Sequence, residues 1–483
     1  MRRASGLSAS PGMINHRPAY HFLPPAGWMN DPNGFIHHRG IYHLFYQHNP
    51  AGAYHADIHW GHARSVDLVR WQHRPMALTP SPGGPDQGGC WSGSAVVAAG
   101  RPLIYYTGVS PQTVCRASGS DDLDEWTKDA ANPLISGPPP GFGGDTGDFR
   151  DPYVWRAGEQ WYMVMGSRVA GEGGAVLLYR SADLLAWEYV GPLLLGDPAR
   201  REPVWTGTMW ECPNLFPLAG RHVLIVSFQD WARGDLLFPG YFVGDFDGVG
   251  FRPGRPRVLE YGGCLYAPLV TIDASGRAVL MGWLMEGRDP AAQRAAGWSG
   301  VMSLPRVLSL GDDETLRIQP IPELAQLRGE PFQPAPQLLY PGAANPLRDV
   351  GGDCLELDLT LTPRGATAFR LRLLASPDGS DGITLRGDFS VGTIAFDRPD
   401  SVAADHPARL AAEIAPLPAE RPLRLRVFVD RSVVEVFVNE RVVLSTRVYA
   451  ARPDSLGVEL LADGGALAIE AIDVWPMRAI WDE

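Results

Sequence analysis

The sequence predicts an all-β protein in which a five-bladed β-propeller is followed by a C-terminal β-sandwich. The chain has 55 glycines and 44 prolines in 483 residues, and so many turn-forming residues argue against a helical bundle. A turn that ends in tryptophan recurs in the first half of the chain, and apolar and polar residues alternate strictly in the last third. Alternation with period 2 indicates half-buried antiparallel strands.

The recurring turn indicates repeated sheets of similar size. It ends at Trp71, Trp126 and Trp187, which are 55 and 61 residues apart, and a weaker copy lies near Phe251. A period near 60 residues with several short strands in each unit is typical of a β-propeller, whereas the alternative is a chance spacing within a sandwich. Short apolar runs give five units: Ile41–Gln47, Leu103–Gly108, Gln160–Ser167, His222–Phe228 and Ala278–Trp283.

A landmark segment precedes each apolar run, and four of the five landmarks contain a proline after their first residue. Proline is tolerated in a strand at the edge of a sheet. We therefore expect these segments to form the innermost strands, which line the central channel. The landmarks are residues 31–34, 91–94, 151–154, 212–215 and 267–270.

These patterns divide the chain into three parts. Residues 18–321 are the predicted propeller, and residues 322–348 hold six prolines, which predict a stiff linker strapped to the first domain. Residues 349–478 are the predicted sandwich, where leucine alternates with polar residues from Leu355 onwards. Glu435 lies on one of these alternating strands, and we expect it to face solvent.

Composition excludes several classes of protein. A formal net charge of −12 argues against a nucleic-acid partner, and the single lysine, Lys128, argues against Schiff-base chemistry. No run of 18 apolar residues is present, so we expect no membrane partner, and we expect no cofactor. Five scattered cysteines and an N-terminal stretch without an apolar core predict a cytoplasmic location.

Three carboxylates occupy matched places in the predicted units. Asp31 and Asp151 each stand directly before the landmark proline, and Glu211 stands one residue earlier in its own unit. On innermost strands they would point toward one mouth of the channel. Gathered carboxylates raise the pKa of at least one of them, and a pair with separated pKa values is what glycoside hydrolysis requires. The alternative is that each acid caps a turn.

The neighbours of these acids suit a sugar ligand, because aromatic walls with amide and hydroxyl groups suit a polyhydroxylated ring. We expect Arg150 to hold the adjacent Asp151 ionised. The predicted partner is thus a small carbohydrate, and the candidate substrate-binding residues are Asn30, Gln47, Trp60, Trp91, Ser92, Arg150, Tyr266 and Trp283.

The sequence offers two other candidate sites. His55, His59 and His62 have a spacing that would suit a metal on a helix, but this segment has the pattern of loop and strand, so no metal site is predicted. Cys212 adjoins Glu211, but no histidine lies beside it in the sequence to activate a thiol nucleophile.

Several segments resemble the signature blocks of glycoside hydrolase family 32, which contains invertases, sucrose-6-phosphate hydrolases, inulinases and levanases. The resemblance lies in residues 28–34, 45–50, 60–63, 91–94, 150–152, 211–213 and 430–437. It implies a propeller with a C-terminal sandwich. It also implies that Asp31 is the nucleophile, Glu211 the acid and base, and Asp151 the stabiliser of the transition state.

The function that the resemblance implies is a retaining β-fructofuranosidase, which releases terminal fructosyl units from sucrose or short fructo-oligosaccharides. A sucrose-6-phosphate hydrolase, an exo-inulinase or levanase, and a fructosyltransferase would use the same site. A carbohydrate-binding propeller without catalysis is the non-enzyme alternative. Residues 261–266 depart from the family pattern, which leaves the leaving group open, and the sequence does not decide the oligomeric state.

Overall fold

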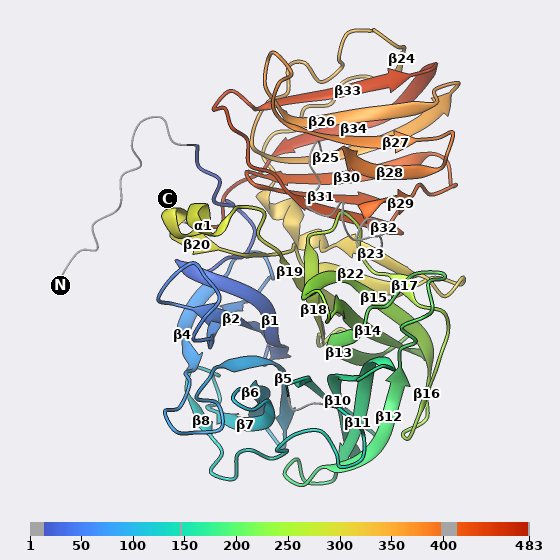
Figure 1. Ribbon diagram of the computed structural model, residues 1–483. Helices are drawn as coiled ribbons and strands as arrows, with labels where there is room; N and C mark the ends of the chain where they lie inside the picture. The colour runs from blue at the N-terminus through green and yellow to red at the C-terminus, as the bar shows by residue number, and fades with distance from the viewer. Residues whose placement is uncertain (1–13, 145–146, 398–412, 482–483) are drawn as a thin grey trace, which may run out of the picture.

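Strands dominate the computed structural model, which describes residues 14–144, 147–397 and 413–481 (Figure 1). The helices that lie wholly within the described residues are α1 (Pro290–Ala296) and the 3-10 helix η1 (Pro322–Leu327). Neither of these helices has the length and apolar character needed to cross a bilayer. Residues 1–13, on which the predicted lack of a secretion signal rests, lie outside the described residues.

Five sheets, antiparallel apart from one short pairing, contain the strands described up to residue 320. The first contains β1 (Gly27–His38), β2 (Ile41–Asn49), β3 (His59–Ser65), β4 (Gln72–Leu78) and β20 (Trp298–Ser299), which runs parallel to β1. The second contains β5 (Cys90–Ala98), β6 (Arg101–Gly108), β7 (Thr113–Gly119) and β8 (Trp126–Lys128). The third contains β9 (Phe149–Ala157), β10 (Gln160–Val169), β11 (Gly173–Ser181) and β12 (Glu188–Leu195).

The other two sheets follow in chain order. The fourth contains β13 (Met209–Leu218), β14 (Arg221–Asp230), β15 (Asp235–Phe246), β16 (Phe251–Pro253) and β17 (Arg257–Val258). The fifth contains β18 (Leu265–Ile272), β19 (Ala278–Leu284), β21 (Val301–Met302), β22 (Arg306–Leu310) and β23 (Leu316–Pro320). The pairing of β20 with β1 brings the chain back from the fifth sheet to the first.

The first strands of the five sheets form a closed ring. Strand β1 contacts β5, β5 contacts β9, β9 contacts β13, β13 contacts β18, and β18 contacts β1 again. Figure 1 shows β1, β5, β13 and β18 around the centre of this part of the molecule. The landmark segments therefore lie on the strands nearest the axis.

Each of these inner strands has a β-bulge at its landmark. Pairing with the next strand shifts at residues 30–31, 92, 151–152, 212–213 and 267–268. Asp151, Cys212 and Ala267 have positive φ angles of 66°, 49° and 48°, which are uncommon for residues other than glycine. A bulge redirects side chains and interrupts the hydrogen bonds that proline cannot make. The x-Pro landmarks are therefore the sites at which side chains are turned toward the axis.

Two of the three recurring tryptophan turns share one hydrogen bond. The indole of Trp71 donates to the carbonyl of Leu68 over 3.1 Å, and that of Trp126 donates to the carbonyl of Leu123 over 2.8 Å. Both leucines have positive φ angles, of 63° and 61°. The indole closes the turn at these two positions, and Leu184 of the third copy has a similar positive φ angle of 66°.

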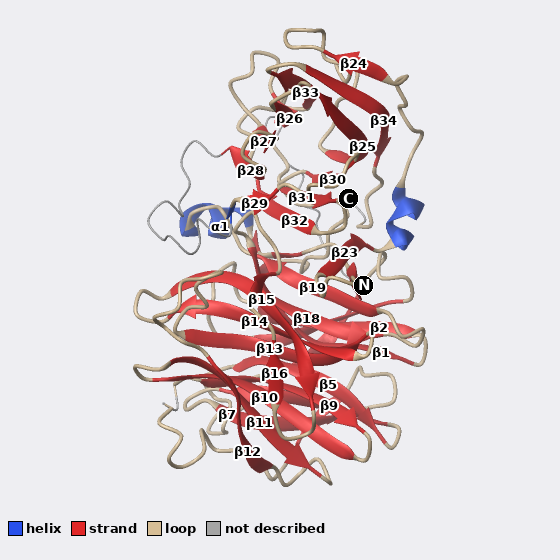
Figure 2. Ribbon diagram, turned by 90° about the vertical axis from the view of Figure 1, so that its right-hand side faces the viewer, coloured by secondary structure: helices blue, strands red, loops and turns tan. Residues whose placement is uncertain are grey.

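The described C-terminal residues form two further sheets. One has the order β24 (Gln337–Leu339), β34 (Ala466–Pro476), β25 (Cys354–Arg364), β30 (Leu423–Asp430), β31 (Val433–Val438) and β32 (Val442–Arg447). The other has the order β29 (Ala415–Pro416), β28 (Thr393–Asp397), β27 (Ile383–Asp388), β26 (Ala368–Ala375) and β33 (Gly457–Asp463). Alternate leucines and valines from both sheets share one core. Figure 2 shows this domain to one side of the five N-terminal sheets.

The proline-rich segment is attached differently from the prediction. Leu324 and Leu327 of η1 pack in the N-terminal core, but the residues that follow pair with the last strand of the C-terminal domain. Phe332 exchanges backbone hydrogen bonds with Val474, and β24 pairs with β34. The segment therefore extends the C-terminal sheet rather than running along the first domain.

The prediction that Glu435 faces solvent is wrong. Its side chain is fully buried, with Oε2 accepting a 2.6 Å hydrogen bond from Arg306 and Oε1 accepting one of 2.7 Å from the amide of Leu304. Alternate residues of β31 pack in different cores, with Val436 in that of the C-terminal domain and Phe437 in that of the N-terminal domain. The face that the alternation indicated as exposed is therefore the interface between the domains.

Candidate active site

The Asp31 carboxylate lies within a network that three strands supply. Its Oδ2 accepts hydrogen bonds from Ser92 Oγ, over 2.6 Å, and from Gln47 Nε2, over 3.1 Å. Its Oδ1 accepts a hydrogen bond of 3.2 Å from the side-chain Nδ2 of Asn30. The network thus fixes the carboxylate from β1, β2 and β5 together.

Cys212 joins Asp31 to Asp151. Its Sγ lies 3.6 Å from Oδ2 of each aspartate, and its backbone amide donates to Asp151 Oδ2 over 2.9 Å. Burial raises the pKa of the thiol well above its ordinary value, and the neighbouring carboxylates raise it further. Cys212 therefore remains a neutral thiol, which is a poor nucleophile. Since Glu211 directly precedes Cys212, the three predicted acids meet at the axis.

Two donors orient the Glu211 carboxylate. Arg150 Nε donates to Oε1 over 2.9 Å, and the Tyr266 hydroxyl donates to Oε2 over 2.5 Å. These residues hold matched places in their strands, because each directly precedes a bulge. The hydrogen bonds of the Arg150 side chain go to Glu211 and to other neighbours rather than to the adjacent Asp151. The charge of Arg150 lowers the pKa of Asp151, in the direction expected from the sequence, but burial outweighs this effect.

The two aspartates bind protons more tightly than usual. Burial raises the pKa of Asp31 to about 6, against the opposing hydrogen bond from Ser92, and the charge of Glu211 raises it further. Burial also raises the pKa of Asp151 to about 7, although the charge of Arg150 opposes this. One site thus holds three carboxyl groups, of which two titrate near neutral pH.

Aromatic side chains surround the Asp31 side of the site. The rings of Trp28 and Trp283 lie 6.0 Å apart, and the His55 ring lies 5.9 Å from Trp28 and 6.0 Å from Trp91. The Trp28 indole also donates to Asn30 Oδ1 over 2.7 Å. Tyr266 and Trp283 pack in the same cluster as Trp28, so the predicted residues of the fifth sheet join those of the first.

Trp60 is the predicted site residue whose place differs most from the expectation. Its exposed fraction is 0%, and it packs with Phe45 and Tyr106 in the core between the first two sheets. Its indole donates to the backbone carbonyl of Trp91 over 3.0 Å. Trp60 therefore supports the wall of the site from below and does not line it.

The three histidines of the rejected metal site are separated in the structure. His62 is buried against His43, with a 3.0 Å contact between the rings, whereas His55 lies near the tryptophans of the site. Over the described ranges, no group of three or more His, Cys, Asp and Glu side chains has an arrangement that would hold a metal ion.

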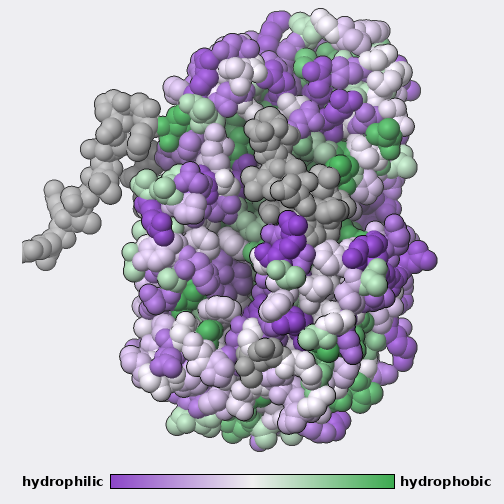
Figure 3. All heavy atoms as spheres, viewed as in Figure 1, coloured by the Kyte–Doolittle hydropathy of each residue, from purple (hydrophilic) through white to green (hydrophobic). Residues whose placement is uncertain are grey.

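The channel narrows beneath the acids. A cavity of about 20 Å³ lies there, bounded mainly by residues of the five bulges, including Pro32, Pro152, Pro213 and Pro268. That volume has room for about one water molecule. The space among the bulges is therefore narrow, and hydrophilic side chains predominate on the face of the molecule seen in Figure 3.

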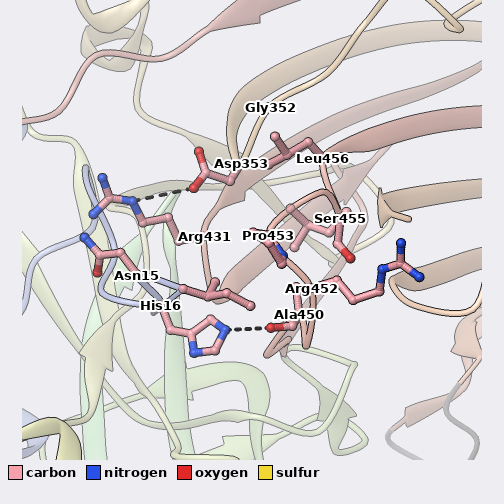
Figure 4. Close-up of a pocket in the computed structure, with 12 residues that line it drawn as sticks. Asn15, His16, Gly352, Asp353, Arg431, Ala450, Arg452, Pro453, Ser455 and Leu456 are labelled. Carbon is pink, nitrogen blue, oxygen red and sulfur yellow. Dashed lines mark hydrogen bonds and ion pairs between the residues drawn. The ribbon is translucent and has the colours of Figure 1, made fainter. Parts of the chain in front are cut away.

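A larger cavity, of about 330 Å³, lies at the edge of the C-terminal domain (Figure 4). It is lined by the segment around His16 and by Arg431, Arg452 and Ser455. Arg431 faces Asp353, and His16 is bonded to the carbonyl of Ala450. None of the predicted site residues lines this cavity.

Sequence reasoning missed three polar residues that hold Arg150. Its guanidinium donates to Gln112 over 3.3 Å and to Gln229 over 3.4 Å, and it lies 3.7 Å from Asp148. Asp148 stands two residues before Arg150 on the approach to β9. Residues two apart lie on the same face of a strand, so this spacing could have indicated the contact. The glutamines come from other sheets and gave no such signal.

Buried carboxylates beside aromatic residues, on the inner strands of a ring of five sheets, suit a site for cleaving glycosidic bonds. Comparisons with known proteins agree. Residues 21–320 match the Glycosyl hydrolases family 32 N-terminal domain, and residues 323–476 match the Glycosyl hydrolases family 32 C terminal domain. The chain belongs to glycoside hydrolase family 32.

Individual relatives extend over nearly the whole chain. A levanase of Bacillus subtilis is 33% identical over 97% of this chain and 71% of its own length. A sucrose-6-phosphate hydrolase of Escherichia coli is 32% identical over 95% of this chain and 94% of its own. The solved β-fructofuranosidase of Bombyx mori is 29% identical and has a TM-score of 0.78. The match covers 97% of this chain and 96% of the Bombyx mori chain. The prediction of an all-β glycoside hydrolase, with a propeller and a C-terminal domain, is confirmed.

Proposed function

We propose that this protein is a retaining β-fructofuranosidase. The observation that carries the proposal is the convergence of Asp31, Asp151 and Glu211, with the Cys212 thiol 3.6 Å from both aspartates. Supporting it, the Bombyx mori relative has also been solved, as a variant, in complex with sucrose. The proposal includes five blades within residues 18–321, a linker at 322–348 and a sandwich at 349–478, with the linker joining the sandwich sheet through β24.

The three acids would divide the chemistry as follows. Asp31 attacks the anomeric carbon of the fructosyl unit while Glu211 gives a proton to the departing oxygen. The covalent intermediate is then cleaved by water, from which Glu211 takes a proton. Asp151 accepts hydrogen bonds from ring hydroxyls that strengthen in the transition state. The raised pKa of Asp31, about 6, leaves this group ionised at neutral pH, as a nucleophile requires.

We propose that the inner strands close the channel beneath the site, which would favour attack at a chain end. One fructosyl unit would fill the space above the bulges, and the rest of the substrate would project from the mouth. We propose that Asn30, Gln47, Trp91, Ser92, Arg150, Tyr266 and Trp283 form the wall that holds this unit or orients the acids. Sucrose and short fructo-oligosaccharides are the proposed substrates, and the cytoplasmic location belongs to this proposal.

The test is release of free fructose from sucrose by the wild-type protein, with Asp31→Asn as the matched control. We expect fructose and glucose in equal amounts from the wild type and none from the variant. Binding of sucrose without release would support the non-enzyme alternative. Glucose release that exceeds fructose release would identify a fructosyltransferase, because the missing fructosyl units would have passed to another sugar.

A further inference from the structure

The leaving-group side of the site can be located from Glu211, and this step rests on the proposed function. If Glu211 protonates the departing oxygen, the departing sugar lies on its side of the scissile bond. Arg150 and Gln229 lie on the same side as Glu211, because Arg150 donates hydrogen bonds to both Glu211 and Gln229. The residues just beyond this pair are therefore placed to meet the leaving group.

Trp231 stands in that position. It lies in the turn between β14 and β15, two residues after Gln229, and 48% of its side chain is exposed. Ser227 pairs with Glu211, and the chain continues four residues beyond this pair to reach Trp231, just past the end of β14. The Trp231 indole bonds to Asp148, which lies 3.7 Å from Arg150, so Trp231 lies just beyond the residues that contact Glu211.

The Trp231 ring is held in a fixed orientation. Its indole donates to Asp148 Oδ1 over 3.1 Å, and its backbone amide donates to Thr208 Oγ1 over 3.0 Å. The Arg168 guanidinium lies 3.6 Å from the ring centroid and so covers one face of the ring. Asp148, which anchors the indole, is only 4% exposed.

The arginines near the Trp231 ring are paired with carboxylates. Asp148 accepts a 2.5 Å hydrogen bond from Arg168 and lies 3.7 Å from Arg150, while Arg150 is paired with Glu211. Both arginines are thus engaged by carboxylates. A phosphate at this place would have to compete with Asp148, whereas an uncharged sugar ring would need only an aromatic surface.

We propose that Trp231 is the residue on which the leaving-group sugar stacks, and that it selects an uncharged sugar over a phosphorylated one. Its exposed face would pack against the C–H groups of the ring, and Asp148 and Arg168 would hold it in place. The substrate class of this site is therefore sucrose and unphosphorylated oligosaccharides rather than sucrose with a phosphate on its glucosyl unit.

The test compares Trp231→Ala with wild type on sucrose and on methyl β-D-fructofuranoside, which has no leaving-group sugar. We expect kcat/KM for sucrose to fall about 3- to 10-fold, mainly through KM, as loss of one stacking contact predicts. The methyl glycoside should change less than twofold. Trp231→Phe, which keeps an aromatic face, should recover most of the loss.

Trp205→Ala is the matched control, because Trp205 also carries an arginine over its ring, with Arg201 4.9 Å from the centroid. We expect it to leave both substrates unchanged. An equal loss on the methyl glycoside, or an equal effect of Trp205→Ala, would overturn the role of Trp231. A higher kcat/KM of the wild type for sucrose 6-phosphate than for sucrose would overturn the selectivity. Absence of fructose from every substrate would instead refute the proposed function itself.

Discussion

The Tyr266 hydroxyl donates a 2.5 Å hydrogen bond to Oε2 of Glu211, and the tyrosine belongs to a different sheet from the acid. Burial, with the charge of Glu211, raises the pKa of Tyr266 well above its ordinary value, so the hydroxyl keeps its proton at any working pH. The bond therefore fixes the direction in which Glu211 faces the substrate. Tyr266 is a positioning residue, since it acts through Glu211.

Tyr266→Phe should lower kcat for sucrose by about 10- to 100-fold, a part of the roughly 10²- to 10⁴-fold that general acid catalysis contributes. The loss should be much smaller for a fructoside whose activated leaving group needs no proton. Steady-state kinetics on the two substrates would check this. Equal losses on both would show that Tyr266 does not act through Glu211.

The pH dependence of kcat/KM should report the ionisation of the aspartates. Asp31, with its pKa raised to about 6, must lose its proton before it can attack, so kcat/KM should fall as the pH drops below that value. Ser92→Ala removes the hydrogen bond that most strongly opposes this rise. The acid limb of the profile should then move to higher pH, and an unmoved limb would contradict the assignment to Asp31.

Asp151→Asn should abolish most activity and yet stabilise the fold. The pKa of Asp151 is raised from 3.8 to about 7 in the folded state, so the folded protein binds this proton more tightly than the unfolded chain does. The stability that the bound proton contributes is fully present below about pH 4 and is lost as the pH rises through 7. An asparagine has no such loss. The variant should gain up to about 4 kcal/mol over wild type at pH 8, because the pKa rises by about 3 and each pKa unit corresponds to about 1.4 kcal/mol.

Chemical unfolding of both proteins at pH 4 and pH 8 would measure this effect. The gain should be confined to the higher pH, because the protonated aspartic acid and asparagine are alike in charge. A variant that is less stable than wild type at pH 8 would contradict the argument.

The buried pair of Glu435 and Arg306 should matter for stability. Glu435→Ala would leave a buried guanidinium without its carboxylate, which costs about 3–5 kcal/mol when one partner is removed. Glu188→Ala is the control, because Glu188 pairs with Arg180 on the surface and exposed pairs contribute about 1 kcal/mol or less. Equal effects in denaturant unfolding would contradict the buried role of Glu435.

How far the sequence predicts this structure depends on whether a signal is local. The x-Pro landmarks are local, and they identified the inner strands because proline is accepted where a bulge interrupts the ladder. The same landmarks aligned Asp31 with Asp151 and offset Glu211 by one residue. The convergence of three acids from separate sheets could therefore be predicted.

Contacts between distant segments left no such signal. The alternation that includes Glu435 has the same period whether the polar face meets solvent or the other domain, so it could not reveal the interface. Trp60 is aromatic beside a sugar site, yet its ring lies in the core below. The pairing of Arg150 with Glu211 crosses from the third sheet to the fourth, and sequence adjacency pointed to Asp151 instead.

The most direct test of the account is to find the residue that carries the fructosyl unit during turnover. Glu211→Ala should slow the second step more than the first when the leaving group is activated, so the intermediate should accumulate. Rapid acid quench, proteolysis and mass spectrometry would then locate the added mass. We predict one fructosyl unit on the peptide containing Asp31, and its loss in the double variant with Asp31→Ala. A modified Asp151, or turnover of the Glu211 variant with inversion and no covalent adduct, would contradict the central claim.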